Sequence, residues 1–364
     1  MKNLRKILGM ILTVAMVCGL LTACGNGSSS TGPATGDGDV SPSDDTVYQW
    51  NLASIFANPE TSSDFNGNGV VQALFVQYVN ERSNGRLVIT PYYDSILGGS
   101  LEQFEQVQRG ELEMALLQPM SSYDSRFGAY SIPYLFEDID EVQALAGEPD
   151  GPIFKLSEEW FADHNMVFLG AGCAQFRGIF NTKHEVTTVD SVRDLKLRTY
   201  QDTLVSAFWD DICNAVPMSF SDVYTSLQTK AIDGLEFSAQ NTYVYKYPEL
   251  GGYYTDIDWQ WCSATNLVVN ADSFNALPSD LQALVRECAY DALSQYAVLE
   301  KEGNEQVYKR MEEEFGVQVH ILTDEERATW QEYAKSKEEE YREFIGPEIY
   351  DQMVAIVEEY RSGQ

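Results

Sequence analysis

The sequence predicts an α/β protein of two lobes with a ligand cleft between them, and three observations support that prediction. Short strand-like runs alternate with helical patterns of about 10–15 residues, as they do in βαβ units. The alternation begins near residue 48 and resumes as a second set from Gly170. The roughly 318 residues that follow residue 46 are enough for two lobes rather than one small core.

Residues 1–23 have the features of a secretion signal. A basic stretch precedes an apolar run at 7–21, which is too short for a comfortable membrane span. The run ends in Leu-Thr-Ala-Cys, which resembles a bacterial lipobox and predicts cleavage before Cys24 with a lipid on its thiol. The alternative is an unmodified cysteine beside an ordinary signal. Residues 24–46 are rich in Gly, Ser, Thr, Asp and Pro, so we expect a flexible linker there. Together with the lipid on Cys24, this predicts an exported protein that is anchored at the outer face of the cytoplasmic membrane.

The net charge of the chain is −32. Such an acidic chain is a poor partner for nucleic acid or for an anionic membrane surface, and it suits an exported protein. The negative electrostatic field of such a chain also repels an anionic ligand. Carboxylate binding would therefore have to come from a few locally placed, desolvated arginines. We expect no cofactor and no metal.

Four cysteines follow the linker, and their spacing fits no metal-binding pattern. In an exported protein they can form two disulfides, but a core of this size does not need them. We therefore favour buried free thiols and leave the disulfides open as the alternative. The four are Cys173, Cys213, Cys262 and Cys288.

The first set of elements begins with Tyr48–Ala53, whose side chains alternate like those of a half-buried strand. Asn84–Gly85 is a common signal for the end of a helix. Gly98–Gly99 predicts a loop before a helix that starts near Ser100. In order, we expect a strand at 48–53, a loop at 54–66, a helix through 70–79, a strand at 86–93, a helix at about 100–110 and a strand at 111–117.

The second set contains a helix that follows a Pro-Met-Ser-Phe turn. Ser219 and Asp222 stand at the spacing of a capping box, which predicts that the helix begins just after Ser219. Phe220 and Tyr224 form an i,i+4 pair on its apolar face. The other expectations are strands at 178–181, 195–199, 232–236 and 266–270, and a helical region from 278 to the C-terminus whose charged run at 324–344 forms solvated helix faces.

Five segments carry motifs in a recognisable order. The most informative, from Asp190 to Glu236, contains DSVRDLKLR and then PMSFSDVYTSLQTKAIDG. The others are RSNGRLVITPYYDSILGGSLEQFEQVQRGELEMAL at 82–116, FGAYSIPYLFEDIDEVQAL at 127–145, FRGIFNTKHEVTTVDSVRDLKLR at 176–198 and LPSDLQALVRECAYDA at 277–292. In this order they resemble the solute-binding proteins of tripartite ATP-independent periplasmic (TRAP) transporters, the DctP family. The resemblance covers roughly residues 47–340.

This resemblance implies a two-lobed periplasmic-binding-protein-like fold, with several chain crossings and a long helix between the lobes. By analogy, one lobe comprises 47–174 plus 263–302, and the other comprises 175–262 plus 303–364. The implied function is the capture of a small organic acid by lobe closure and its delivery to a TRAP permease, by a protein that is monomeric.

The resemblance also implies the ligand-binding residues. The family counterpart of Arg198 holds the ligand's carboxylate, and a guanidinium offers two parallel donors that match a carboxylate. The alternative is an arginine in a structural salt bridge. Arg177 matches a second ligand-contacting arginine of many members. Phe220 matches an aromatic wall beside the ligand, unless it is only a core aromatic. Phe237 departs from the family, because many members have Asn there.

Weaker candidates come from position and residue type. Gln118, Asn58 and Ser54 follow strands, where ligands collect in α/β lobes. Aromatic side chains supply ring faces and polar tips to binding sites, and here the candidates are Tyr243, Trp259 and Trp261. For each of these residues, packing is an equally good explanation.

The main rival function is an enzyme, such as a secreted hydrolase. The chain contains no GxSxG, HExxH or Walker-type motif, and His164, His184 and His320 occur in unrelated contexts. His184 is most simply a surface residue. Pairs of acidic residues are too abundant for counting to exclude a glycosidase-like dyad. We expect a binding protein rather than an enzyme, with a sensor that presents its ligand to a membrane receptor as the second alternative.

Overall fold

The computed structural model describes residues 46–59, 67–173, 175–263 and 265–363. The expected signal peptide, the lipid site at Cys24 and nearly all of the expected linker lie outside the described residues. No helix in the described part is long and apolar enough to cross a membrane.

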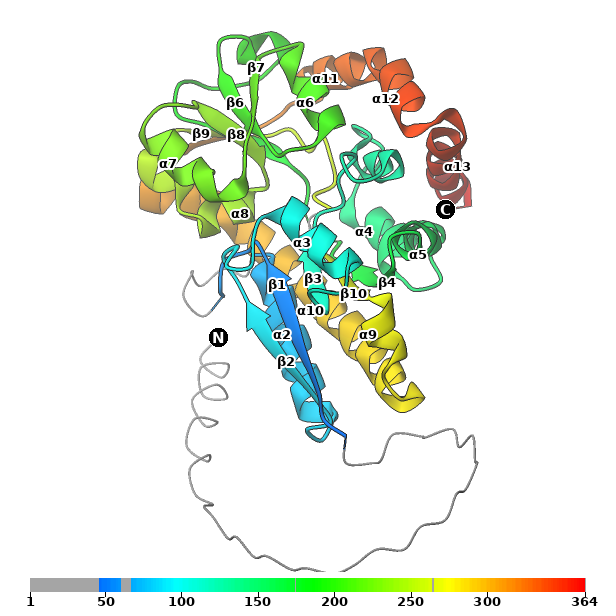
Figure 1. The fold of residues 1–364 in the computed structure, drawn as a ribbon. Helices are drawn as coiled ribbons and strands as arrows, with labels where there is room; N and C mark the ends of the chain where they lie inside the picture. The colour runs from blue at the N-terminus through cyan, green and yellow to red at the C-terminus, as the bar shows by residue number, and fades with distance from the viewer. Residues whose placement is uncertain (1–45, 60–66, 174, 264, 364) are drawn as a thin grey trace, which may run out of the picture. The chain divides into compact units, whose positions relative to one another are not determined.

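The first sheet has five strands in the order β2-β1-β3-β10-β4 (Figure 1). Strand β1 pairs in parallel with β2 and β3, whereas β10 is antiparallel to β3 and β4. The strands are β1 (Tyr48–Ser54), β2 (Leu87–Tyr92), β3 (Met114–Leu117), β4 (Met166–Ala171) and β10 (Asn266–Asn270).

Alternate residues of these strands enter two different cores, because successive side chains of a strand point to opposite faces. Leu52 of β1 packs with the helix residues Phe75 and Val285 on one face. Its neighbour Ala53 packs with Phe104 on the other. Helices therefore cover both faces of the first sheet. They include α2 (Gly69–Arg82) and α10 (Ser279–Phe315), which supply Phe75 and Val285, and α3 (Ser100–Gln108), which supplies Phe104. The other helical segments in this part of the chain are α4 (Ile139–Val142), α5 (Pro152–Ala162), α9 (Ala271–Asn275), η1 (Ser125–Ser131) and η2 (Gln143–Gly147).

The second sheet has six strands in the order β11-β9-β5-β8-β6-β7. Strand β6 is parallel to β7 and β8, whereas β5 is antiparallel to β8 and β9. The strands are β5 (Gly178–Asn181), β6 (Lys196–Thr199), β7 (Asn214–Pro217), β8 (Gly234–Phe237), β9 (Tyr253–Asp256) and β11 (Gln318–Ile321).

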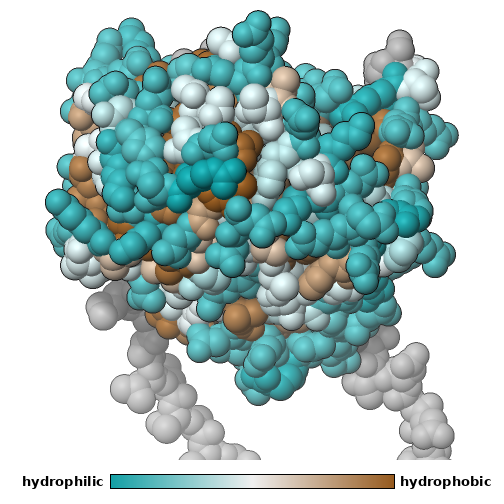
Figure 2. All heavy atoms as spheres, turned by 90° about the horizontal axis from the view of Figure 1, so that it is seen from above, coloured by the Kyte–Doolittle hydropathy of each residue, from teal (hydrophilic) through white to brown (hydrophobic). Residues whose placement is uncertain are grey.

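The helices that follow these strands include three at the C-terminus, α11 to α13. The α-helices are α6 (Thr203–Asp210), α7 (Val223–Gln228), α8 (Ala239–Val244), α11 (Asp324–Ser336), α12 (Glu338–Ile345) and α13 (Pro347–Gly363), and the 3₁₀ turns are η3 (Val189–Val192), η4 (Phe220–Asp222) and η5 (Tyr247–Leu250). The acidic side chains of α11 and α12 are largely exposed while Trp330 and Tyr341 are buried, so the charged run forms the solvated faces that we expected. Figure 2 shows a face on which hydrophilic residues predominate.

The chain passes between the two sheets three times. Two of the passages, from β4 to β5 and from β9 to β10, run side by side and form an antiparallel bridge between Phe176 and Trp261. The amide of Arg177 donates to the carbonyl of Gln260 at 3.0 Å in the same bridge. The third passage is α10 (Ser279–Phe315), a helix of 37 residues that packs on α2 and on α8 (Figure 1).

The predicted fold class, a two-lobed α/β protein with a long connecting helix, is confirmed. Two details of the prediction are wrong. The C-terminal region is not helical throughout, because Gly316 ends α10 in the left-handed conformation (φ 70°) and β11 then pairs with β9. Ser219 is the N-cap of the 3₁₀ turn η4, which begins directly after it as predicted, but its Oγ contacts Ser221 Oγ at 3.1 Å and makes no capping hydrogen bond, and α7 begins only at Val223.

Candidate functional site

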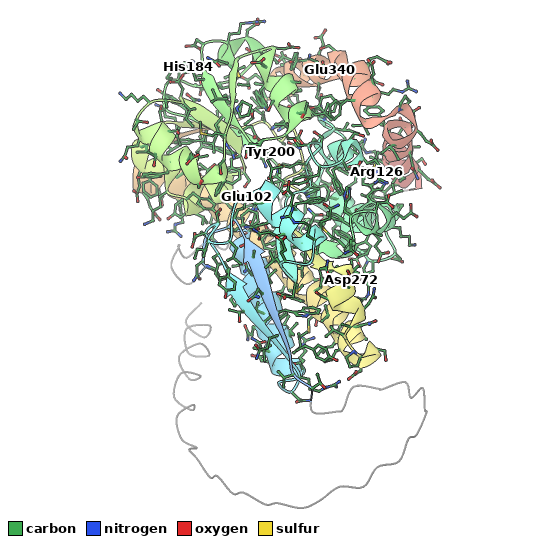
Figure 3. The ribbon with its side chains drawn as sticks, viewed as in Figure 1. Glu102, Arg126, His184, Tyr200, Asp272 and Glu340 are labelled. Atoms are coloured by element: carbon green, nitrogen blue, oxygen red, sulfur yellow. The ribbon has the colours of Figure 1, made fainter. Side chains whose placement is uncertain are left out.

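A cleft lies between residues of the two sheets, and both contribute to its lining. The first sheet and its helices supply Ile55, Phe56, Ser95, Gly99, Ser100, Gln118 and Met120, and the second supplies Arg177, Arg198, Tyr200, Gln201, Met218, Ser219, Phe220 and Phe237. In Figure 3, Tyr200 and Glu102, which lies in the first turn of α3, mark the two sides. A Cβ added to Gly99 would lie 4.0 Å from Ser219 Oγ, so the two sides approach closely at this edge.

Arg198 reaches the cleft from β6, a strand in the interior of the second sheet. The strand pairs Arg198 with Val216 of β7 on one side and with Leu235 of β8 on the other. The residue is only 3% exposed. Its Nε and Nη2 both donate to the carbonyl oxygen of Met218, at 3.3 Å and 3.1 Å. No carboxylate of the described residues lies within ion-pair distance of this guanidinium, and Nη1 has no partner among them.

Burial lowers the pKa of Arg198 to about 10, and the positive charge of Arg177 also lowers it, whereas the carboxylate of Glu236 raises it. Arg198 is therefore still protonated at neutral pH, but burial makes its charged form less favourable than it would be in water. A buried charge without an ion partner is costly unless something compensates it. An anion in the cleft would provide that compensation.

Arg177 differs from Arg198, because it already has an anionic partner. Its Nη2 donates to Glu236 Oε1 at 3.0 Å and its Nε donates to Oε2 of the same carboxylate, which makes a two-point ion pair. Burial opposes the charge of Arg177, but Glu236 outweighs burial and holds the pKa of Arg177 above its ordinary value. The guanidinium carbon lies 4.8 Å from the ring centre of Tyr200 and 5.5 Å from that of Phe237.

Aromatic rings form a wall beside the two guanidiniums. The guanidinium carbon of Arg198 lies 5.8 Å from the ring centre of Phe220. The ring of Phe220 lies 5.6 Å from that of Phe237 and 4.6 Å, edge-on, from that of Tyr245. The hydroxyl of Tyr245 accepts a hydrogen bond from the amide of Ala57 at 2.8 Å. The wall is thus joined to the first sheet's side of the cleft.

Gln118 is a polar residue on the first sheet's side of the cleft whose side chain has no partner among the described residues. It directly follows β3 and is 8% exposed. Its side-chain amide makes no hydrogen bond to any described residue, so both its N–H and its C=O groups are available to a ligand. The structure therefore brings five predicted residues together in one cleft: Gln118, Arg177, Arg198, Phe220 and Phe237.

Three predicted residues are not among those that line the cleft. Trp259 is fully buried and stacks on Phe208 at 4.8 Å. Tyr243 donates to Glu314 Oε2 at 2.6 Å, on the side of α8 that faces α10. Asn58 is half-buried in the loop after β1.

The side chains of the weaker candidates Ser54 and Trp261 also contact other residues of the protein. Ser54 Oγ donates to Gln72 Oε1 at 2.5 Å. The ring of Trp261 packs edge-on against Tyr130.

Several lining residues were missed by the sequence analysis. Tyr200 follows Arg198 by two residues, and Met120 follows Gln118 by two. Ile55 directly follows the end of β1. A rule that extends every strand end by two or three residues would have found all three. The bond between Arg177 and Glu236 had no such signal, because it depends on the pairing of β5 with β8.

The remaining predictions about chemistry concern cysteines, histidines and metals. The four cysteines are buried, and no two of them form a disulfide in the described part of the chain. His184 lies at the outer edge of the second sheet in Figure 3, where its Nε2 contacts Asp194 Oδ1 at 2.9 Å. Within the described residues, no group of three or more His, Cys, Asp or Glu side chains is placed to hold a metal ion.

Two α/β lobes with an unpaired, buried cation in the cleft between them define a solute-binding protein of the periplasmic type. Residues 56–344 match the family described as bacterial extracellular solute-binding protein, family 7, or DctP. The chain therefore belongs to this family, as its motifs predicted. The family is one of solute-binding proteins, not of enzymes.

Individual relatives are distant but similar over most of their length. A solute-binding protein of Chromohalobacter salexigens is 28% identical over 260 residues, which cover 71% of this chain and 76% of the relative. The C4-dicarboxylate-binding periplasmic protein DctP of Rhodobacter capsulatus is 26% identical over 283 residues, which cover 76% and 83%. The crystal structure of a TRAP periplasmic solute-binding protein from Chromohalobacter salexigens with bound D-glucuronate superposes with a TM-score of 0.76 at 25% identity, covering 85% of this chain and 99% of that one.

Proposed function

We propose that this protein captures a small organic acid outside the cytoplasm and delivers it to a TRAP permease in the membrane. Arg198 holds the carboxylate of the acid. The observation that carries this proposal is the burial of Arg198 without an anionic partner among the described residues. A ligand carboxylate would complete an ion pair that the protein leaves open.

The chemistry of the guanidinium suits this role. Hydrogen bonds between an arginine and a carboxylate are charge-assisted and often paired, and they are strongest where water is excluded. Met218 occupies only one edge of Arg198, so Nη1 remains free to donate to the ligand. The names of two relatives support a carboxylate, since one binds C4-dicarboxylates and the other was crystallised with D-glucuronate.

Closure of the two lobes over the ligand is part of the proposal. We place one lobe at 47–174 plus 263–302 and the other at 175–262 plus 303–364. The division at 302 falls inside α10, which spans both lobes, so this helix and the paired passages at 176 and 261 would form the hinge. The ligand can favour the closed state only by its higher affinity for that state.

We also propose that Cys24 carries a lipid that anchors the protein at the outer face of the cytoplasmic membrane. The support is the lipobox-like Leu-Thr-Ala-Cys sequence. A Cys24→Ser variant should then move from the membrane fraction to the soluble fraction of cells. A membrane association that survives the substitution would contradict the anchor. We propose a monomer that needs no cofactor and has no catalytic role.

Thermal denaturation of the mature domain with a library of organic acids tests the proposed ligand class. A ligand at 100 times its dissociation constant stabilises the folded state by about 2.7 kcal/mol, which raises the melting temperature by several degrees. Titration calorimetry then compares Arg198→Ala with the parent protein. We expect affinity to fall by about 2–5 kcal/mol, because a charged partner of the ligand is removed.

Arg342→Ala is the matched control for the loss of a positive charge. Arg342 pairs with Asp351 on the exposed surface at 2.7 Å and does not line the cleft. Its removal should leave affinity close to that of the parent protein. Near-parent affinity in Arg198→Ala, or binding of neutral sugars alone, would contradict the proposed carboxylate site.

A further inference from the structure

The charges around the cleft leave one uncompensated positive charge. Among the described residues that line it are two arginines and no acidic side chain. Glu236 neutralises Arg177 through its two-point ion pair. Arg198 is held only by a backbone carbonyl group. One carboxylate on a ligand would therefore neutralise the site.

A second carboxylate on the ligand would have no such partner. In the part of the lining that the structure describes, there is no further Lys, Arg or His side chain. An ionised carboxylate that is buried without a cation or hydrogen-bond donors costs several kcal/mol. The net charge of −32 adds a long-range repulsion for every additional negative charge on the ligand. The electrostatics thus select against dicarboxylates.

The surface next to Arg198 is apolar. Phe220 lies beside the guanidinium of Arg198 and Phe237 beside that of Arg177, and the two ring centres are 5.6 Å apart. Ile55, Phe56 and Met120 face the cleft from the first lobe, and all three are buried. A ligand body with several hydroxyl groups would lose its hydrogen bonds to water against these side chains and gain few in return.

Polar side chains also line the cleft. Besides the two arginines, they are the amides of Gln118 and Gln201 and the hydroxyl groups of Ser95, Ser100, Tyr200 and Ser219. Two of these hydroxyl groups already have partners, because Ser219 Oγ contacts Ser221 Oγ at 3.1 Å and the Tyr200 hydroxyl accepts from Gln260 Nε2 at 3.0 Å. The others can orient a few polar atoms of a ligand.

We infer that the ligand is a monocarboxylate with a largely apolar body, aliphatic or aromatic, that lies against Phe220 and Phe237. This inference rests on the proposed function, since it assumes that Arg198 receives a carboxylate. It adds that one carboxylate is the limit and that Phe237 determines specificity for an apolar body.

The first test is a direct comparison of matched acids by titration calorimetry on the mature domain. Pentanoate and glutarate have the same number of carbons and differ only in a terminal methyl or carboxylate group. Phenylacetate and D-glucuronate provide an aromatic and a polyhydroxylated monocarboxylate. We expect pentanoate or phenylacetate to bind at least about tenfold more tightly than glutarate and D-glucuronate, a difference of about 1.4 kcal/mol.

The outcomes separate this inference from the proposed function. Tighter binding of glutarate or D-glucuronate, lost in Arg198→Ala, would overturn the inference and leave the carboxylate-binding function intact. Binding of glutarate that does not depend on Arg198 would overturn both. Silence from all four acids and from the wider acid library would also overturn both.

The second test changes the wall itself. Phe237→Asn places an amide beside Arg177 and should shift the ratio of D-glucuronate to pentanoate affinity at least about tenfold toward D-glucuronate. Phe237→Leu is the matched control, because it keeps the wall apolar. Its affinity for pentanoate should fall but should remain higher than its affinity for D-glucuronate. The melting temperature of each variant without ligand shows whether it has folded. An unchanged ratio in folded Phe237→Asn would overturn the role of Phe237.

Discussion

The two buried arginines of the second lobe lie close together but differ in what neutralises them. Arg177 sits on a chain passage between the lobes and is held by the Glu236 carboxylate. Arg198 sits at the end of β6 and, among the described residues, is held only by the carbonyl group of Met218. Both are buried, so burial alone does not mark a binding residue. The lack of an internal anion is what distinguishes Arg198 as the group that would receive a ligand.

The largest effect should come from breaking the internal pair. Arg177→Met leaves Glu236 buried with its ion-pair partner removed, and removal of one partner of a buried pair costs about 3–5 kcal/mol. We therefore expect the free energy of unfolding, measured by urea denaturation, to fall by that amount. The fall should appear without any ligand present.

A double variant is the control for this prediction. Arg177→Met combined with Glu236→Met replaces the whole pair by apolar side chains, which is often close to neutral for stability. The double variant should recover much of the stability that Arg177→Met loses. A single variant as stable as the parent protein would mean that the pair is not the structural element described here.

The sequence predicted the secondary-structure elements and the family better than it predicted which of the two arginines has an internal ion-pair partner. Short strand patterns and helix-ending glycines are local, so β1 and α2 were found near their observed bounds, and the start of α10 was found within one residue, but its end at Gly316 was missed. The pairing of Arg177 with Glu236 is not local, because 59 residues separate the two side chains. Only the register of the second sheet brings them together, and a single sequence does not contain that register.

The candidate site and the helix starts show the same limit. Trp259 and Tyr243 were chosen because aromatic residues often line ligand sites, but the structure packs both against other side chains. Ser219 has the spacing of a capping box and stands at the start of η4, yet its hydroxyl contacts Ser221 instead of capping the turn. Residue type and spacing describe what a side chain can do, and the tertiary fold decides which groups it meets.

Glu300 on α10 is a buried acidic residue that, like Arg198, has no ion-pair partner among the described residues. It is fully buried, and its Oε2 receives a hydrogen bond from Gln175 while Oε1 has no partner among the described residues. Burial raises the pKa of Glu300 well above its ordinary value, and the hydrogen bond from Gln175 only partly opposes this shift. Unlike an arginine, a carboxyl group can become neutral at ordinary pH by binding a proton.

This difference predicts a pH dependence of stability. Because the pKa of Glu300 is raised in the folded state, its contribution is fully present below the unfolded pKa and is lost as pH rises toward the folded pKa. Glu300→Gln keeps the shape but cannot titrate. Between pH 5.5 and 7.5, we expect the stability of the variant relative to the parent to increase by up to about 1.4 kcal/mol per pH unit. Urea denaturation at several pH values measures it, and a constant difference would mean that Glu300 is ionised to the same extent in the folded and unfolded states, so that its folded pKa is not raised into this range.

The smallest change in stability should come from Arg198→Met, and it completes the comparison with Arg177→Met. The substitution removes a buried charge that has no ion partner, which favours folding, but it also removes two donors to Met218, which costs about 1 kcal/mol. The two effects oppose each other, so the free energy of unfolding without ligand should stay within about 1 kcal/mol of the parent value. Urea denaturation of both methionine variants, side by side, measures the contrast. A loss in Arg198→Met as large as that in Arg177→Met would show that Arg198 stabilises the fold, and the charge in the cleft would then not be reserved for a ligand.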